Sequence, residues 1–239
     1  MIFLKTEINY LGYVMDKKGI RPTNEHLQAM KNLPDPKNIK ELQSFMGKIN
    51  CYIKFIKKAA QISAPLNKLR RKDVPYIWTS QCKQAYQQLK NQLLQKSCLV
   101  HFCPDKHLVL ATDASSHGIG AVLAHRNPDG TESLIAYASK TLNKAQMNYS
   151  QIEKEALAIV YAVNKFNQFL YGKKFSLITD HKPLIAIFNP AREIPQRTAP
   201  RLQRWALLLS NYNYDIHFRP TSLHANADAL SRLPAGPDQ

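Results

Sequence analysis

The fold is decided by a strand, a turn and a second strand in the stretch LATDASSHGIGAVL, residues Leu110–Leu123. The apolar segment 107–112 predicts the first strand, and 118–125 predicts the second. The Ser-Ser-His-Gly sequence between them is typical of a tight turn. A third predicted strand, 133–138, follows a Pro-Asp-Gly turn. Three successive strands joined by tight turns predict an antiparallel meander.

The residues after this meander change from an alternating to a helical pattern and back. Their spacing predicts a long helix over 151–170, a strand over 174–179, helices over 183–188 and 199–211, a strand over 214–219 and a closing helix over 225–231. The predicted order is βββαβααβα, which indicates an α/β domain.

The residues before position 104 predict a small helical unit. A strand pair is expected within 2–15, and Thr23 is expected to cap a short helix that reaches Leu33. Asn38 is expected to cap a longer helix, whose apolar positions keep helical spacing through Ile56. Two further helices are expected around 65–69 and from about 80 to 94.

The charge of the chain favours a polyanionic partner. The 239 residues, enough for one or two domains, carry 33 Lys and Arg against 17 Asp and Glu, a net charge of +16. Residues 1–103 hold 18 of the basic and 6 of the acidic residues. We therefore expect nucleic acid as the partner, bound mainly by the first part of the chain. The alternative is that the excess charge only maintains solubility.

The sequence contains no apolar run of the length that a signal peptide or a membrane span requires. The four cysteines lack paired spacing, which favours free thiols in a reducing compartment over disulfides or a zinc site. We expect an intracellular protein, in a cytoplasmic particle or the nucleus, without a membrane partner.

Three aspartates lie at or near the ends of predicted elements. Asp113 ends the first strand of the meander, Asp180 follows the strand 174–179, and Asp228 lies in the closing helix. If the two strands are neighbours, these carboxylates gather at one edge of the sheet, where they can bind divalent cations. Each acid alone is equally well explained as a solvated cap, so only their joint arrangement indicates a site.

Two glutamates on the long helix are separated by local chemistry. Ser150 and Glu153 form a Ser-x-x-Glu capping box, which accounts for Glu153. Glu155 has no capping role and flanks an apolar stripe that includes Ile159. A carboxylate in that place needs a partner such as a metal, and we therefore choose Glu155.

Four segments, in this order and spacing, resemble the ribonuclease H domain of gypsy-type LTR-retrotransposon reverse transcriptases: LATDASSHGIGAVL (110–123), YSQIEKEALAIVYAV (149–163), FSLITDHKPL (175–184) and HANADALSR (224–232). The resemblance implies a mixed five-stranded sheet with flanking helices. It also extends into the first half of the chain, where three segments are similar to the primer grip and the thumb: INYLGYVMDKKGI (8–20), LPDPKNIKELQSFMGKINCYIKFI (33–56) and YIWTSQCKQAYQQLK (76–90).

We therefore expect a palm-derived primer-grip remnant over 1–22, a helical thumb and connection over 23–103, a nuclease domain over 104–234 and a tail over 235–239. The resemblance implies that the family's four metal-binding catalytic acids are Asp113, Glu155, Asp180 and Asp228. Family enzymes bind two Mg²⁺ ions, or Mn²⁺ as a substitute, and cleave the RNA strand of an RNA:DNA hybrid. They leave a 3′-hydroxyl and a 5′-phosphate, and no side chain becomes a covalent nucleophile.

The chain departs from the family pattern in two respects. Many ribonucleases H carry a mobile histidine where this chain has Phe218, so an accessory role in product release would fall to His224, His181, His217 or no histidine. The sequence also contains no Asp-Asp pair, and thus lacks the Tyr-x-Asp-Asp element of the polymerase site. We expect no polymerisation by this chain alone, although its parent polyprotein is an RNA-directed DNA polymerase.

Basic residues of the expected thumb are candidate phosphate contacts: Lys54, Lys57, Lys58, Arg70, Arg71 and Lys72. The first three are expected on one face of the Asn38-capped helix, where like charges would need a bound anion. The alternative functions are a catalytically idle hybrid-binding module and an accessory fragment of a polymerase whose palm lies elsewhere. Retention of all four acids favours the nuclease over a pure clamp, because carboxylates repel phosphate.

Overall fold

The computed structural model describes residues 5–95, 98–195 and 198–220. Its chain divides into two compact units, which we describe separately. The first comprises Met1–His101 together with Tyr137–Thr141, and the second comprises Phe102–Ala136 and Leu142–Gln239. Among the described residues, no helix has the length and apolar character needed to cross a membrane.

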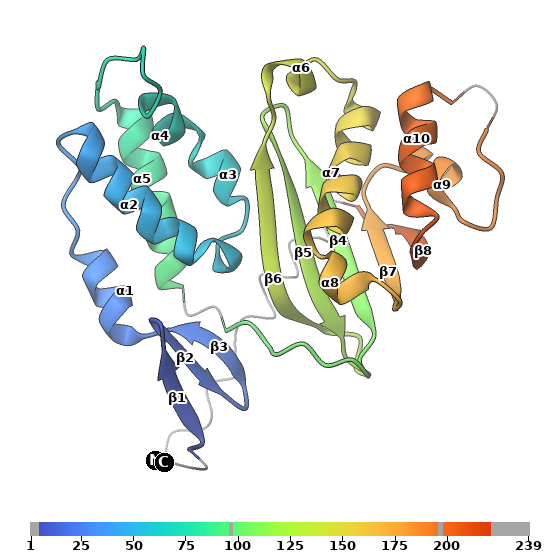
Figure 1. The fold of residues 1–239 in the computed structure, drawn as a ribbon, viewed down its shortest axis with the longest axis horizontal. Helices are drawn as coiled ribbons and strands as arrows, with labels where there is room; N and C mark the ends of the chain where they lie inside the picture. Colours follow the sequence, from blue (N-terminus) through green and yellow to red (C-terminus); the bar gives the residue numbers. More distant parts are fainter. Residues whose placement is uncertain (1–4, 96–97, 196–197, 221–239) are drawn as a thin grey trace. The chain divides into compact units, whose positions relative to one another are not determined.

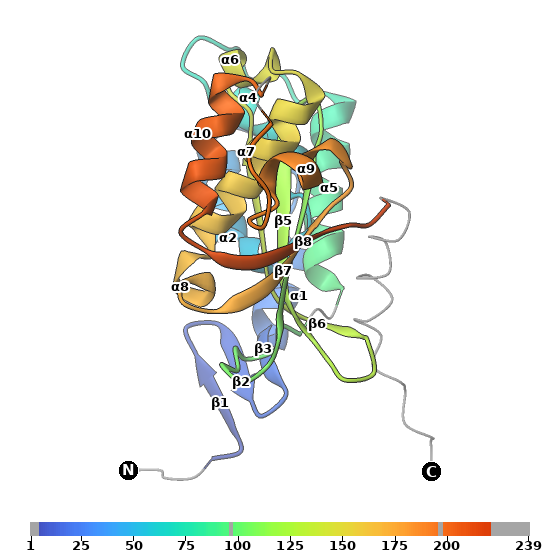
Figure 2. The ribbon, with the colours of Figure 1, turned by 90° about the vertical axis from the view of Figure 1, so that its right-hand side faces the viewer.

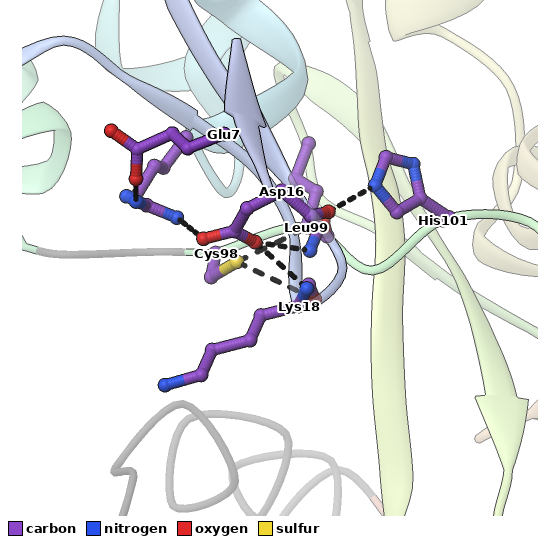
Figure 3. A network of polar contacts seen from close by, with 8 residues as sticks. Glu7, Asp16, Lys18, Cys98, Leu99 and His101 are labelled. Atoms are coloured by element: carbon purple, nitrogen blue, oxygen red, sulfur yellow. Dashed lines mark hydrogen bonds and ion pairs between the residues drawn. The ribbon is translucent and has the colours of Figure 1, made fainter. Parts of the chain in front are cut away.

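The first unit begins with a three-stranded antiparallel sheet, ordered β1 (Glu7–Tyr10), β2 (Tyr13–Asp16) and β3 (Gly19–Pro22). The predicted strand pair was therefore one strand short. Asp16 stabilises the β2–β3 turn, because its Oδ1 accepts the backbone N–H groups of Lys18 at 2.7 Å and Gly19 at 3.1 Å (Figure 3). This turn returns the chain alongside β2, and β3 follows.

A residue distant in sequence completes the edge of this small sheet. Ile20 and Leu99 exchange two backbone hydrogen bonds, at 2.7 and 2.9 Å. The backbone at Gly19 must approach so closely that an added Cβ would lie 2.1 Å from the Leu99 carbonyl oxygen, so only glycine fits there. His101 Nε2 lies 2.7 Å from the Asp16 carbonyl oxygen (Figure 3). These long-range contacts explain why sequence patterning missed β3.

Five α-helices and a 3₁₀ turn follow in the first unit: α1 (Asn24–Lys31), α2 (Ile39–Cys51), the 3₁₀ turn Ile53–Phe55, α3 (Ala59–Ile62), α4 (Ala64–Leu69) and α5 (Ser80–Leu94). The predicted caps are confirmed, because Thr23 and Asn38 each accept a backbone N–H three residues on. The core is formed mainly by α2 and α5, with buried Leu42, Phe45, Ile49, Tyr86 and Leu89.

The prediction that α2 continues through Ile56 was wrong. The helix ends at Cys51, and Lys58 has the left-handed φ of 53° that starts the next helix. Ile56 is nevertheless buried, which explains the continued apolar spacing. Lys54, Lys57 and Lys58 therefore do not share a helix face, and the like-charge argument for a bound anion does not hold there.

The second unit contains a mixed five-stranded sheet, as predicted. Its strands are β4 (Leu108–Ala114), β5 (Gly118–Arg126), β6 (Glu132–Thr141), β7 (Lys174–Thr179) and β8 (Asn213–Phe218). The order is β6-β5-β4-β7-β8, with β4 antiparallel to β5 and parallel to β7, and β7 parallel to β8. Figure 2 shows β7 and β8 side by side at one end of this order.

The helices of this unit are α6 (Lys144–Met147), α7 (Gln151–Lys165), α8 (Asn167–Leu170), α9 (Pro183–Phe188) and α10 (Pro200–Leu209). The predicted long helix is interrupted at Phe166, where the backbone leaves the helical region (φ −104°, ψ 17°). The predictions did not include α6, a single turn closed by a capping box between Asn143 and Gln146. The predicted closing helix lies outside the described residues.

Helix α7 packs against β4 and β5, and α10 packs against α7 (Figure 1). Small side chains permit this close approach, because Ala156, Ala158 and Ala162 are all fully buried. Ala158 belongs to a cluster with Ala114 of β4 and Ile119 of β5. This packing places the first two turns of α7 beside the end of β4.

Candidate metal-binding site

Three carboxylates meet where β4, β7 and α7 come together. Asp113 is the penultimate residue of β4, Asp180 directly follows β7, and Glu155 lies in the second turn of α7. One carboxylate oxygen from each lies within 4.8 Å of the others. Among the described residues, this is the one group of three or more potential metal ligands that meets this distance condition.

The sheet register explains why the two aspartates meet. Strands β4 and β7 are parallel neighbours, with Ala111 opposite Ile178. Continuing this register by two residues places Asp113 beside Asp180, with both side chains on the same face of the sheet. The structure thus brings together three of the four predicted acids. Asp228, like His224, lies outside the described residues.

Glu155 is the buried member of the group, with 3% of its surface exposed. Its Oε1 accepts a hydrogen bond from Gln151 Nε2 at 2.7 Å. Its Oε2 is buried without a hydrogen-bond partner. Burial, and then repulsion by Asp180 and Asp113, raise the pKa of Glu155 to about 8. A cation beside Oε2 would offset both the missing hydrogen bond and the repulsion.

Glu153 lies in a different environment, although it is only two residues away. The predicted capping box is confirmed, since Glu153 Oε2 accepts the Ser150 backbone N–H at 3.0 Å and its hydroxyl at 2.8 Å. Oε1 accepts a hydrogen bond from Arg201 at 2.5 Å. The Ser150 hydrogen bonds and Arg201 hold the pKa of Glu153 below its usual value. Its partners are thus protein groups.

Gln151 is a residue of this site that the sequence predictions did not include. Besides its contact with Glu155, its Nε2 lies 3.3 Å from the Ala114 carbonyl oxygen. The available signal was its position four residues before Glu155, because residues at i and i+4 share a helix face. Glutamine is also common at exposed positions that have no role in a site, so spacing alone could not have selected it.

The candidate accessory groups lie near the same edge of the sheet. His181 follows Asp180, is half-buried, and donates its backbone N–H to Thr179 Oγ1 at 3.2 Å. The Lys182 ammonium lies 4.8 Å from the centre of the Phe218 ring. Phe218, at the position where a histidine was expected, is therefore in contact with a cation. His217 is exposed on β8.

The basic residues of the first unit differ in their surroundings. The Lys54 ammonium lies 4.5 Å from the centre of the Tyr13 ring, and burial lowers its pKa. Lys57 and Lys58 are half-buried. Arg70 donates to Asn67 Oδ1 at 3.0 Å, and Arg70, Arg71 and Lys72 are exposed. The last three have the accessibility that phosphate contacts need, and their role stays a prediction.

Residues 103–212 match a family model, the RNase H-like domain found in reverse transcriptase. This part of the chain is an RNase H-like domain. Over 233 residues, 97% of the chain, the sequence is 37% identical to the Tf2-3 and Tf2-4 transposon polyproteins of Schizosaccharomyces pombe (strain 972 / ATCC 24843). The chain spans 17% of the length of these relatives. The RNase H-like domain thus belongs to a retrotransposon reverse transcriptase polyprotein.

Solved structures agree with this fold. The foamy viral protease-reverse transcriptase in complex with dsDNA matches 91% of this chain and 46% of its own, with a TM-score of 0.72 at 22% identity. The same viral protein in complex with an RNA/DNA hybrid matches 91% of this chain and 30% of its own, with a TM-score of 0.71 at 22% identity. The match extends beyond the RNase H-like domain into the first unit.

Proposed function

We propose that this chain is a Mg²⁺-dependent endonuclease that hydrolyses the RNA strand of RNA:DNA hybrids, as part of a gypsy-type retrotransposon reverse transcriptase. The observation that carries this proposal is the group of Asp113, Glu155 and Asp180, whose oxygens converge within 4.8 Å from three separate elements. The Tf2 relatives support the retrotransposon setting, and the viral reverse transcriptase solved with a hybrid supports the substrate.

The donor set fits a hard divalent cation. It consists of carboxylate oxygens, which Mg²⁺ and Mn²⁺ prefer, and Glu155 Oε2 lacks any other partner. Asp113, Glu155 and Asp180 would hold the metal, together with the predicted fourth ligand, Asp228. Bound metal would lower the pKa of the attacking water and stabilise the departing 3′-oxygen.

The protein's own residues orient the reaction. Asp113 and Asp180 are held by parallel neighbouring strands, and their separation therefore depends on the sheet register. Glu155 approaches from α7, whose buried alanines set the distance between helix and sheet. Carboxylates held in this way need no rearrangement when a cation binds, which preserves affinity and geometry. No side chain of the group acts as a covalent nucleophile.

The first unit would serve as the thumb and connection that hold the duplex, with the domain boundaries at 22, 103 and 234. The net charge of +16 and the exposed side chains of Arg70, Arg71 and Lys72 support this role. The same observations favour the second candidate, a module that binds hybrids without cutting them. The two candidates differ in whether bound hybrid is cleaved.

A labelled RNA:DNA hybrid tests the proposal directly. We expect cleavage of the RNA strand with Mg²⁺, none with EDTA, and products that end in a 3′-hydroxyl. Asp113→Asn should abolish cleavage but leave hybrid binding equal or tighter, because one negative charge near the scissile phosphate is removed. Hybrid binding without Mg²⁺-dependent cleavage by the wild type would favour the binding module instead.

A further inference from the structure

The side chain of Gln151 joins the glutamate of α7 to the strand that carries the first aspartate. Gln151 is the first residue of α7 and is exposed, but its Nε2 reaches inward to two acceptors. These are Glu155 Oε1 at 2.7 Å and the carbonyl oxygen of Ala114 at 3.3 Å. Ala114 directly follows Asp113 in β4.

This contact decides which oxygen of Glu155 is left for a ligand. An amide nitrogen has two N–H groups, one for each acceptor. The first occupies Oε1, and the second fixes the amide to the backbone of β4. Oε2 then remains as the buried oxygen without a hydrogen-bond partner. A glutamate side chain has three rotatable bonds, and one oxygen held in this way restricts its rotation.

The helix turn that carries Gln151 is itself held firmly. On the neighbouring positions, Ser150 and Glu153 form the capping box, and Arg201 of α10 binds Glu153. The Arg201 guanidinium also lies over the Tyr149 ring, 4.0 Å from its centre. Gln151 therefore extends from a fixed backbone, which is what a residue that orients another side chain requires.

We propose that Gln151 is a positioning residue for the metal site: its amide holds Glu155 Oε1 against β4 and directs Oε2 toward the divalent cation. This inference rests on the proposed function, because it assumes that the carboxylates bind Mg²⁺. Residues that orient metal ligands typically contribute about tenfold to a hundredfold to metal affinity or activity. Gln151 would act through Glu155 and need not touch the cation.

The test replaces Gln151 with methionine, which has a similar length and no amide. Gln203→Met is the matched control, because Gln203 Nε2 also donates to a backbone carbonyl, that of Thr198, at 2.9 Å. We expect Gln151→Met to weaken Mg²⁺ binding, measured by calorimetry on the full chain, about tenfold or more. Gln203→Met should bind Mg²⁺ like the wild type.

Kinetics provide a readout that a purely structural role would not produce. At limiting Mg²⁺, Gln151→Met should lower kcat for hybrid cleavage, leave the KM for the hybrid unchanged, and recover kcat at high Mg²⁺. In the Glu155→Gln background, Gln151→Met should cause no further loss of Mg²⁺ affinity, because the residue on which it acts is already removed.

Folding is checked by circular dichroism in EDTA, and Gln151→Ala, with its high helix propensity, is a second variant that should reproduce the result. Wild-type affinity for Mg²⁺ in both variants would overturn the positioning role and leave the proposed function intact. An equal loss of affinity in the Glu155→Gln background would also overturn it. Failure of the wild type to bind Mg²⁺ or to cleave would overturn both proposals.

Discussion

The buried carboxylate of Glu155 should make the metal-free RNase H-like domain less stable as the pH rises. The pKa of Glu155 is raised to about 8 in the folded protein, against an ordinary value of 4.5. Between these two values the folded state holds a proton that the unfolded state has released. Stability is therefore highest below the lower pKa, falls as the pH rises through this window, and levels off above about pH 8.

The size of this loss follows from the two pKa values. Each pKa unit corresponds to about 1.4 kcal/mol, so the upper bound is about 5 kcal/mol. This is a large fraction of the stability of an ordinary domain, which is about 5 to 15 kcal/mol. Glu155→Gln removes the ionisable group and retains its shape. In EDTA at about pH 8.5, the variant should therefore be several kcal/mol more stable than the wild type.

Urea unfolding monitored by tryptophan fluorescence can measure this difference in the relevant unit. The chain has two tryptophans, Trp78 in the first unit and Trp205 in α10. A Trp78→Phe background therefore reports on the second unit alone. The stability difference between Glu155→Gln and Glu155 should grow from about pH 5 to about pH 8, and Mg²⁺ should stabilise only the protein that retains Glu155.

Glu153→Gln is the control on the same helix, because the pKa of Glu153 is lowered by its hydrogen bonds with Ser150 and by Arg201. Its contribution has the opposite sign: it is present above the ordinary glutamate pKa and is lost as the pH falls through the lowered value. We expect this variant to cost about 1 kcal/mol near neutral pH and to leave Mg²⁺ stabilisation unchanged. A wild-type protein and a Glu155→Gln variant with parallel pH dependence would refute the reasoning.

Three further predictions concern function. Glu155→Gln should abolish hybrid cleavage whereas Glu153→Gln leaves it nearly intact, as measured by single-turnover assays; the reverse outcome would show that the wrong glutamate was chosen. Neutralising all three residues of the exposed basic run should flatten the plot of log affinity against log salt by roughly 0.9 for each phosphate that the variant no longer binds, taking B-DNA as a guide, without lowering cleavage at saturating hybrid; an unchanged slope would assign the charge another role. The run comprises Arg70, Arg71 and Lys72. With primer, template, nucleotides and Mg²⁺, the purified chain should add no nucleotide above background, because its sequence contains no Asp-Asp pair; primer extension would contradict this.

Features set by neighbouring residues could be predicted from the sequence. The capping box of Ser150 and Glu153 needs only residues three apart, and the structure contains it. The strand 174–179 and the helix 183–188 agree with the predicted boundaries, because turn residues and proline mark their ends locally. The same local chemistry separated Glu153 from Glu155.

Features that depend on distant partners were decided only by the tertiary structure. Strand β3 pairs with Leu99, nearly eighty positions away, and no local pattern contains that pairing. Helix α2 ends at Cys51 although the apolar spacing continues, because Ile56 is buried from a different backbone conformation. Lys54 lies over Tyr13, a ring brought near by the fold.

The metal-binding site shows both origins. The residue types and their places at strand ends could be derived from the sequence, since a carboxylate at the end of a buried strand is a local fact. The convergence of Asp113, Glu155 and Asp180 depends on which strands are neighbours and on how closely α7 packs. The contact between Gln151 and Glu155 depends also on side-chain rotation. A hydrogen bond forms over about 3 Å, and only folded coordinates define distances on that scale.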